Sequence, residues 1–117
     1  MKLAVYGTLK QGYGNNVLLK DCQFLGRGTI TGYRMYQSGI PYVVLDPSND
    51  RYKVHVEVYD CPKHVVTGSV DRLEGHPEWY CRTPCVVTME DGTEVPAEVY
   101  LVPSCTGTEV LSGNFSR

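Results

Sequence analysis

Two short segments of the sequence contain residues whose types and spacing suit chemistry on a small molecule. The first is the loop that begins at Gly7 and Thr8, directly after an apolar strand pattern at residues 2–5. Glycine and a small hydroxyl residue let backbone N–H groups approach an anionic or carbonyl oxygen closely, as they do in anion-binding loops. The sequence therefore predicts a loop that offers its backbone to a ligand, although the same pattern also occurs in plain strand-to-loop turns.

The second segment is DRLEGHPEWYCR, residues 71–82, in which Glu74 lies one residue before Gly75. Gly75 and Pro77 are typical of a helix end, so Glu74 is predicted in the last helical turn. A carboxylate is disfavoured there because the C-terminal end of the helix dipole is partially negative. Two interpretations follow: a solvated glutamate at a helix end, or a carboxylate used for acid/base chemistry.

Composition and charge argue against several other classes of function. The net charge is −2 and no window is rich in Lys or Arg, so neither nucleic acid nor an anionic membrane surface is expected as a partner. No apolar run reaches the roughly 20 residues that span a bilayer, and Met1 leads into a strand pattern rather than a signal peptide. These features predict a cytoplasmic protein, and they leave its oligomeric state open.

The cysteines indicate neither a disulfide framework nor a metal site. Their odd number and irregular spacing fit reduced thiols, at Cys22, Cys61, Cys81, Cys85 and Cys105. Cys81 and Cys85, with His76 nearby, are the one group that suggests a metal. Their C-x3-C spacing has no second matching pair and both lie on a predicted strand, so no metal is expected.

The elements that must position the two segments are mostly short strands. Alternating apolar patterns predict strands at residues 2–5, 28–39, 40–46, 51–60, 79–89 and 94–102, the last two joined by an Asp-Gly turn. Residues 16–20 predict a single helical turn. One longer helix is predicted after Asp60, its N-cap, with an apolar stripe at Val66, Val70 and Leu73. This pattern favours an α+β fold, a small mixed β-barrel with one main helix.

The length fits one domain. Residues 1–102 contain all the predicted elements. Residues 103–117 are polar, contain glycine and have no clear periodicity. They are therefore predicted to form a C-terminal tail that is partly disordered.

Taken together, five blocks of the sequence resemble the gamma-glutamylcyclotransferase-like family, in its AIG2-like and gamma-glutamylamine cyclotransferase branch. In chain order the blocks are VYGTLKQGYGNNVLL, FLGRGTITGYRMY, EVYD, DRLEGHPEWYCR and DGTEVPAEVYL. They cover roughly residues 3–102, and their order makes the match far more specific than either chemical segment alone. The resemblance implies the same small mixed barrel.

The resemblance also implies an enzyme that releases a γ-linked glutamyl group as 5-oxoproline, without cofactor or metal. It implies Glu74 as the acid/base and the loop Tyr6, Gly7, Thr8 and Leu9 as the cradle of the substrate. By their positions in the matching blocks, Tyr42, Tyr80 and Tyr100 are candidates for aromatic walls, and Arg82 for a contact with the substrate's α-carboxylate. For each of these four residues, a purely structural role is the alternative.

The implied reaction needs a proton acceptor and donors to a developing negative charge, and the two segments can supply both. An α-ammonium must lose a proton before its nitrogen attacks the γ-carbonyl carbon, and one glutamate can take that proton and return it to the leaving amine. Loop N–H groups are suited to the negative charge that develops on the carbonyl oxygen. The alternatives are a binding module that recognises a glutamyl-type ligand without turnover, and a barrel that serves only as a scaffold.

The sequence departs from the family pattern in two places, which bear on substrate choice more than on fold. Val56 stands where the family's Gly-Glu-Val-Tyr block has glycine, and CPKHVVTGSV, residues 61–70, lacks the usual leucine-rich pattern.

Overall fold

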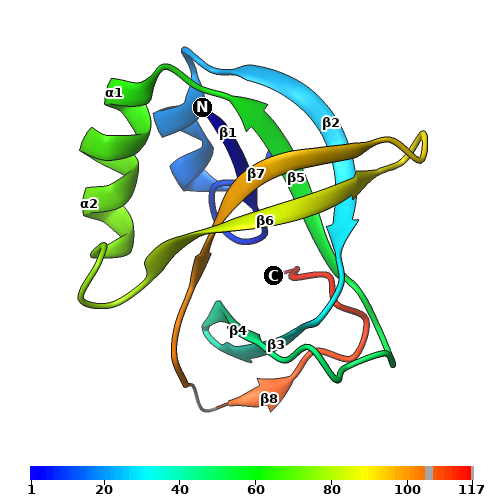
Figure 1. The fold of residues 1–117 in the computed structure, drawn as a ribbon. Helices are drawn as coiled ribbons and strands as arrows, with labels where there is room; N and C mark the ends of the chain where they lie inside the picture. Colours follow the sequence, from blue (N-terminus) through cyan, green and yellow to red (C-terminus); the bar gives the residue numbers. More distant parts are fainter. Residues whose placement is uncertain (105–106, 117) are drawn as a thin grey trace.

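A computed structural model describes residues 1–104 and 107–116, and its central feature is a closed barrel of five strands (Figure 1). In barrel order the strands are β1 (Lys2–Val5), β5 (Val54–Asp60), β2 (Gln23–Ile30), β6 (Cys81–Met89) and β7 (Glu94–Leu101). Neighbouring strands are antiparallel except for β1 and β7, which close the barrel as a parallel pair. The mixed β-barrel predicted from the sequence is confirmed.

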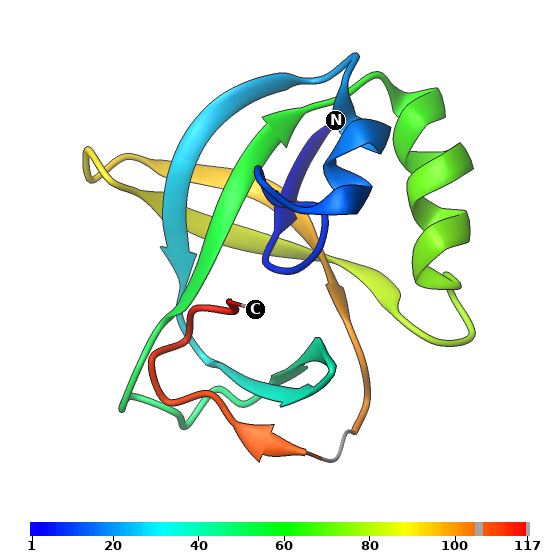
Figure 2. The same ribbon diagram turned by 180° about the vertical axis from the view of Figure 1, so that it is seen from behind.

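A second, three-stranded sheet lies below the barrel (Figures 1 and 2). Its order is β4 (Ile40–Leu45), β3 (Tyr33–Ser38) and β8 (Thr108–Glu109). The predicted strand 28–39 is thus two strands in two different sheets, because Gly32, with φ of +89°, turns the chain between them.

Three strand boundaries differ from the sequence prediction. Strand β2, the barrel part of the predicted strand 28–39, begins at Gln23 rather than at residue 28. A bulge between Phe24 and Gly26 lets this glycine-containing stretch pair with β5. Strand β5 begins at Val54 rather than at residue 51, and β6 at Cys81 rather than at residue 79. In each case the strand begins where backbone pairing with a neighbouring strand begins, and the residue types alone do not mark that position.

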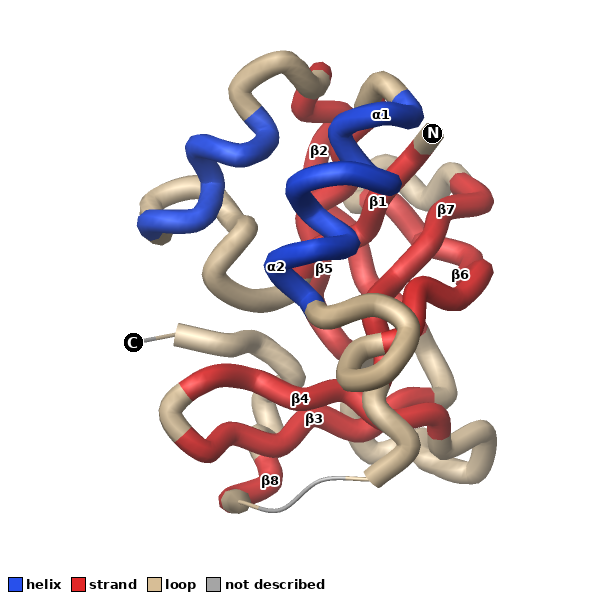
Figure 3. Tube along the Cα trace, turned by 90° about the vertical axis from the view of Figure 1, so that its left-hand side faces the viewer, coloured by secondary structure: helices blue, strands red, loops and turns tan. Residues whose placement is uncertain are grey.

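The main helix runs from residue 63 to 74 and lies against the outside of the barrel (Figure 3). It consists of α1 (Lys63–Val65), a π-helical turn (Val66–Val70) and α2 (Asp71–Glu74). The predicted N-cap is wrong. Asp60 ends β5 and its carboxylate lies 3.4 Å from the amino group of Met1, while Pro62 occupies the cap position without a side-chain hydrogen bond.

The π-helical turn also changes which face of the helix is buried. A π turn spans one residue more than an α turn, so positions after it are rotated relative to an i, i+4, i+7 stripe. Val66 and Val70 are buried as predicted, but Leu73 is 39% exposed. Leu73 lies instead at the edge of the pocket described below.

The core has two parts that meet at the barrel wall. One fills the barrel and extends to the small sheet, and the other lies between the barrel, the main helix and the 3₁₀ helix Gly14–Leu19, which replaces the predicted helical turn at 16–20. Because β1 contributes alternate side chains to both parts, its end at Val5 is fixed from two sides.

The described part of the C-terminal segment packs against the rest of the protein. Strand β8 pairs with β3, and Phe115, only 1% exposed, belongs to the barrel core. The buried Lys10 donates hydrogen bonds to Asn114 Oδ1 (3.1 Å) and to the carbonyl oxygen of Phe115 (2.9 Å). Residues 105, 106 and 117 lie outside the described residues, and partial disorder of 103–117 stays a prediction.

Candidate active site

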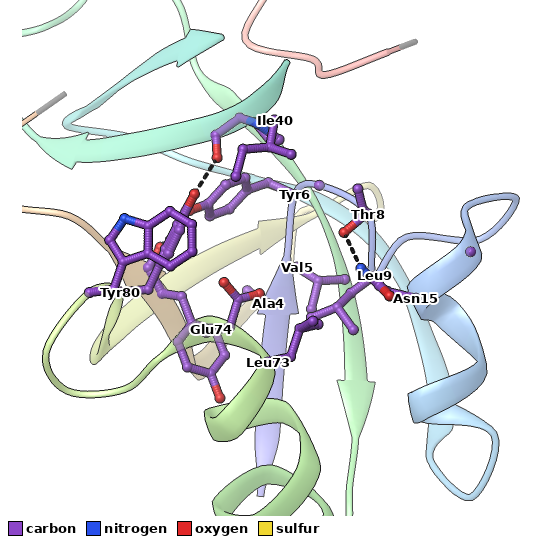
Figure 4. Close-up of a pocket in the computed structure, with 15 residues that line it drawn as sticks. Ala4, Val5, Tyr6, Thr8, Leu9, Asn15, Ile40, Leu73, Glu74 and Tyr80 are labelled. Carbon is purple, nitrogen blue, oxygen red and sulfur yellow. Dashed lines mark hydrogen bonds between the residues drawn. The ribbon is translucent and has the colours of Figure 1, made fainter. Parts of the chain in front are cut away.

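A pocket of about 370 Å³ lies where the end of β1, the end of the main helix and the start of β4 meet (Figure 4). It brings together seven of the nine residues that the sequence predicted for the site: Tyr6, Gly7, Thr8, Leu9, Glu74, Tyr80 and Tyr100. It is completed by residues that the sequence reasoning did not select, namely Ala4, Val5, Gly14, Asn15, Ile40, Pro41, Leu73 and Trp79.

The loop after β1 lines the pocket with residues 6–9. Three of its acceptors are occupied: Lys10 N–H donates to Gly7 O (3.0 Å), and the side chains of Asn15 and Asn16 donate to Thr8 Oγ1 and Leu9 O (both 2.8 Å). Within residues 1–104 and 107–116, no hydrogen bond uses the N–H of residues 7, 8 or 9. These three donors are therefore available to an anionic or carbonyl oxygen.

A side chain at position 7 would collide with its neighbour, although the backbone conformation there does not itself require glycine. A Cβ atom at this position would lie 2.7 Å from Pro41 Cγ, across the pocket wall. The loop can approach the start of β4 this closely only because residue 7 has no side chain.

Glu74 is directed into the pocket from the last turn of α2 (Figure 4). Gly75, with φ of +67°, ends the helix directly after it and lets the chain turn away. In the described part of the chain no hydrogen bond or ion pair reaches the Glu74 carboxylate, and burial raises its pKa from 4.5 to about 7. A carboxyl group with such a pKa exchanges protons readily near neutral pH.

Three tyrosines form walls of the pocket, and the hydroxyl of each donates a hydrogen bond to the protein. The hydroxyl of Tyr6 donates to Tyr100 O (2.7 Å), that of Tyr80 to Pro41 O (2.9 Å) and that of Tyr100 to Asp71 Oδ1 (2.5 Å). Burial and the bond to Asp71 raise the pKa of Tyr100. Each ring is thus fixed by its hydroxyl and offers an apolar surface to a ligand.

Arg82 and Tyr42, the other two predicted residues, do not line the pocket. The guanidinium of Arg82 bonds to Asp71 at 3.0 and 3.2 Å and to both carboxylate oxygens of Glu98 at 3.0 Å. The ring of Tyr42 stacks on Tyr80 with 5.9 Å between centroids. Arg82 is therefore occupied by two carboxylates, and Tyr42 supports the pocket wall from behind.

Asp71 and Trp79 are the most informative residues that the sequence reasoning missed. Both lie in the block that contains Glu74: Asp71 is one helical turn before it, and Trp79 is the only tryptophan. The i, i+3 spacing of two carboxylates, and a large apolar residue next to a helix end, are signals that could have selected them.

Neither a metal site nor a spanning helix is found in the described residues. No group of three His, Cys, Asp or Glu residues there is arranged to hold a metal ion. Cys81 and Cys85 are free thiols, and His76 Nδ1 accepts a hydrogen bond from the backbone N–H of Arg82. Among residues 1–104 and 107–116, no helix is long and apolar enough to cross a membrane.

Comparison with known proteins identifies similar chains over nearly the full length. The model of the family described as gamma-glutamyl cyclotransferase, AIG2-like, matches residues 3–117. A candidate gamma-glutamylcyclotransferase of Methanocaldococcus jannaschii is 37% identical over 114 residues, which cover 95% of this chain and 92% of that protein. A Drosophila melanogaster protein with a name of the same kind is 29% identical, over 86% of this chain and 69% of its own length.

Solved structures share the fold. The crystal structure of protein PH0828 from Pyrococcus horikoshii is 30% identical and has a TM-score of 0.74, covering 98% of this chain and 89% of that chain. An AIG2-like protein from mouse is 27% identical with a TM-score of 0.77, covering 90% of this chain and 78% of that chain.

Proposed function

Because the chain belongs to the AIG2-like gamma-glutamylcyclotransferase family, we propose that it releases 5-oxoproline from a γ-glutamyl amine or a γ-glutamyl peptide. The proposal assigns Glu74 as the acid/base and the N–H groups of residues 7–9 as the donors to the glutamyl group. The observation that carries it is the unpaired Glu74 carboxylate, with its pKa raised to about 7, in the same pocket as three free N–H donors.

The proposed reaction needs one proton carrier and no other reactant. Glu74 accepts a proton from the substrate's α-ammonium group, and the freed nitrogen attacks the γ-carbonyl carbon. The new C–N bond closes the five-membered ring, and the bond from that carbon to the leaving nitrogen breaks. Glu74 passes this proton to the leaving nitrogen, and the second proton that the ring nitrogen loses follows the same route. The amine therefore leaves as an ammonium ion, the ring nitrogen keeps one hydrogen, and the carboxylate is regenerated.

The loop donors are suited to the charge that develops during ring closure. Negative charge builds on the γ-carbonyl oxygen as the nitrogen attacks, and fixed N–H groups stabilise it without having to reorganise. Because the nucleophile is already part of the substrate, the protein mainly has to hold the glutamyl chain in a folded conformation. The rings of Tyr6, Tyr80 and Tyr100 supply rigid walls for that purpose.

The test is detection of 5-oxoproline by mass spectrometry after incubation with a panel of γ-glutamyl amines and γ-glutamyl peptides. Glu74→Gln keeps the size of the side chain but removes the proton carrier, so we expect turnover to fall by about 10²–10⁴-fold. The matched control is Glu78→Gln, an exposed glutamate in the same turn that does not line the pocket, which should retain parent activity.

Two results would contradict the proposal. Parent-like turnover by Glu74→Gln would remove the assigned acid/base. Saturable binding of the compounds by folded protein, without any 5-oxoproline, would instead identify a glutamyl-binding module.

A further inference from the structure

The mouth of the pocket carries an exposed apolar surface that the proposed chemistry does not use. Trp79 is 50% exposed and Leu73 is 39% exposed, and both line the pocket on either side of Glu74 in sequence. A large aromatic side chain left half in water beside a cavity is typical of a binding surface. The remaining apolar walls, such as Ala4 and Tyr100, are buried deeper in the pocket.

Trp79 is held in place before any ligand binds. Its ring lies 4.9 Å from that of Tyr80 and 6.4 Å from that of Tyr42, centroid to centroid, and its backbone N–H donates to Gly75 O at 2.9 Å. Tyr80 is itself fixed by its hydrogen bond to Pro41 O. We call Tyr42, Trp79 and Tyr80 the aromatic platform. Because these side chains are already ordered, binding a ligand that stacks on them costs little side-chain entropy.

The charges around the pocket disfavour a second carboxylate in the substrate. Among the residues that the structure describes, 1–104 and 107–116, those that line the pocket include no Lys, Arg or His, and Glu74 is their only carboxylate. Arg82 is occupied by Asp71 and Glu98. The three loop N–H groups are assigned here to the glutamyl α-carboxylate and γ-carbonyl. A carboxylate on the carbon next to the leaving nitrogen would lie close to Glu74, which repels it when ionised, and would meet no cation in the described lining.

The leaving nitrogen must lie near Glu74, because this carboxylate returns its proton. Substituents on that nitrogen point either into the closed end of the pocket, which the glutamyl chain fills, or to its mouth, where Leu73 and Trp79 are exposed. We propose that Trp79 and Leu73 form the subsite for the leaving group, and that this subsite selects an arylalkyl amine without a carboxylate over an amino acid. The inference rests on the proposed cyclotransferase function.

A matched pair of substrates tests the selectivity. γ-L-Glutamyl-phenethylamide and γ-L-glutamyl-L-phenylalanine differ only in the carboxylate of the leaving group. We expect kcat/KM for 5-oxoproline release to be at least about tenfold higher for the phenethylamide, since the carboxylate of the other compound is repelled by the nearby Glu74. γ-L-Glutamyl-ethylamide, which lacks the ring, should be slower than the phenethylamide by about tenfold.

Substitution of Trp79 tests the subsite. Trp79→Ala should lower kcat/KM for the phenethylamide by about tenfold and change that for the ethylamide by less than about threefold, while Trp79→Phe should retain most of the preference. An equal loss on both amides would show a structural role and overturn the assignment. Equal kcat/KM for the phenethylamide and γ-L-glutamyl-L-phenylalanine would overturn the selectivity and leave the cyclotransferase function intact.

Failure of the proposed function is distinguishable. If no compound yields 5-oxoproline, that function falls, and the fluorescence of Trp79, the sole tryptophan, then reports binding directly. Tighter binding of the phenethylamide in that titration would support the subsite, and equal affinity of the two compounds would overturn it.

Discussion

Asp71 and Glu74 are carboxylates one helical turn apart on α2, and they lie in opposite environments. Burial alone would raise the pKa of Asp71, but hydrogen bonds from Arg82 and Tyr100 lower it below its ordinary value. Glu74 is half-buried and has no such donors, so desolvation raises its pKa to about 7. Asp71 therefore stays charged and structural, whereas Glu74 is free to exchange a proton.

The difference shows that neighbouring groups, and not residue type, assign the role of each carboxylate. The region around Asp71 joins the helix to β6 and β7 through Arg82, Glu98 and Tyr100. The region around Glu74 leaves its polar groups open to a ligand. Four predictions test this contrast, in order of expected effect.

The largest expected effect concerns the structural carboxylate. Asp71→Asn removes the charge that Arg82 and Tyr100 bond to, and we expect the free energy of unfolding to fall by about 3 kcal/mol. Urea denaturation measures it, with Asp21→Asn, an exposed carboxylate, as the control that should change by less than about 0.5 kcal/mol. An Asp71→Asn protein as stable as the parent would remove the contrast between the two sites.

The next effect is on the pH profile of activity. The proposed acid/base role requires an ionised Glu74 to accept the substrate's proton, so kcat/KM should fall below about pH 7, by about tenfold per pH unit and about hundredfold at pH 5. Glu78→Gln should leave this acid limb unchanged. An acid limb with its midpoint near pH 4.5 would mean that Glu74 is hydrated and that burial does not raise its pKa.

Burial of Glu74 also has a cost in stability, with a defined sign. The folded protein holds this proton more tightly than the unfolded chain, so stability falls as pH rises from 4.5 to about 7. Glu74→Gln removes the effect and should be about 2–3 kcal/mol more stable than the parent at pH 8, but equal to it at pH 4. Denaturation at the two pH values measures the difference, and a gain that did not depend on pH would have another cause.

The smallest effect tests where Arg82 acts. Arg82→Lys keeps the positive charge but loses the paired hydrogen bonds to Asp71, and we expect a loss of about 1 kcal/mol in stability with kcat/KM nearly unchanged. If turnover instead fell by more than about tenfold in a protein of parent stability, Arg82 would contact the substrate after all.

The parts of the site that the sequence predicted are those encoded in contiguous residues. Glu74 before Gly75, and the small residues after β1, carry their chemistry in local order, and the structure places both at one pocket. The partners of Arg82 could not be predicted in this way. They depend on Arg82 of β6 lying within reach of both Asp71 on α2 and Glu98 on β7, a contact between segments far apart in the sequence.

The misassigned positions have equally physical reasons. The exposure of Leu73 follows from the π-helical turn, which a period of 3.6 residues does not anticipate. The pairing of β2 from Gln23 onward follows from partners in β5 that local residue types do not reveal. The barrel itself was predictable because its strands are short, alternating and separated by strong turn signals.

The parallel pairing of β1 with β7 has a consequence for how the chain folds. The hairpins β3–β4 and β6–β7 join neighbours in sequence and can form early. Strand β1 finds its partners only at residues 57–60 and 98–99, so the ring closes after most of the chain has been ordered. Since the loop of residues 6–9 follows β1 directly, we expect the substrate cradle to be among the last parts to assemble.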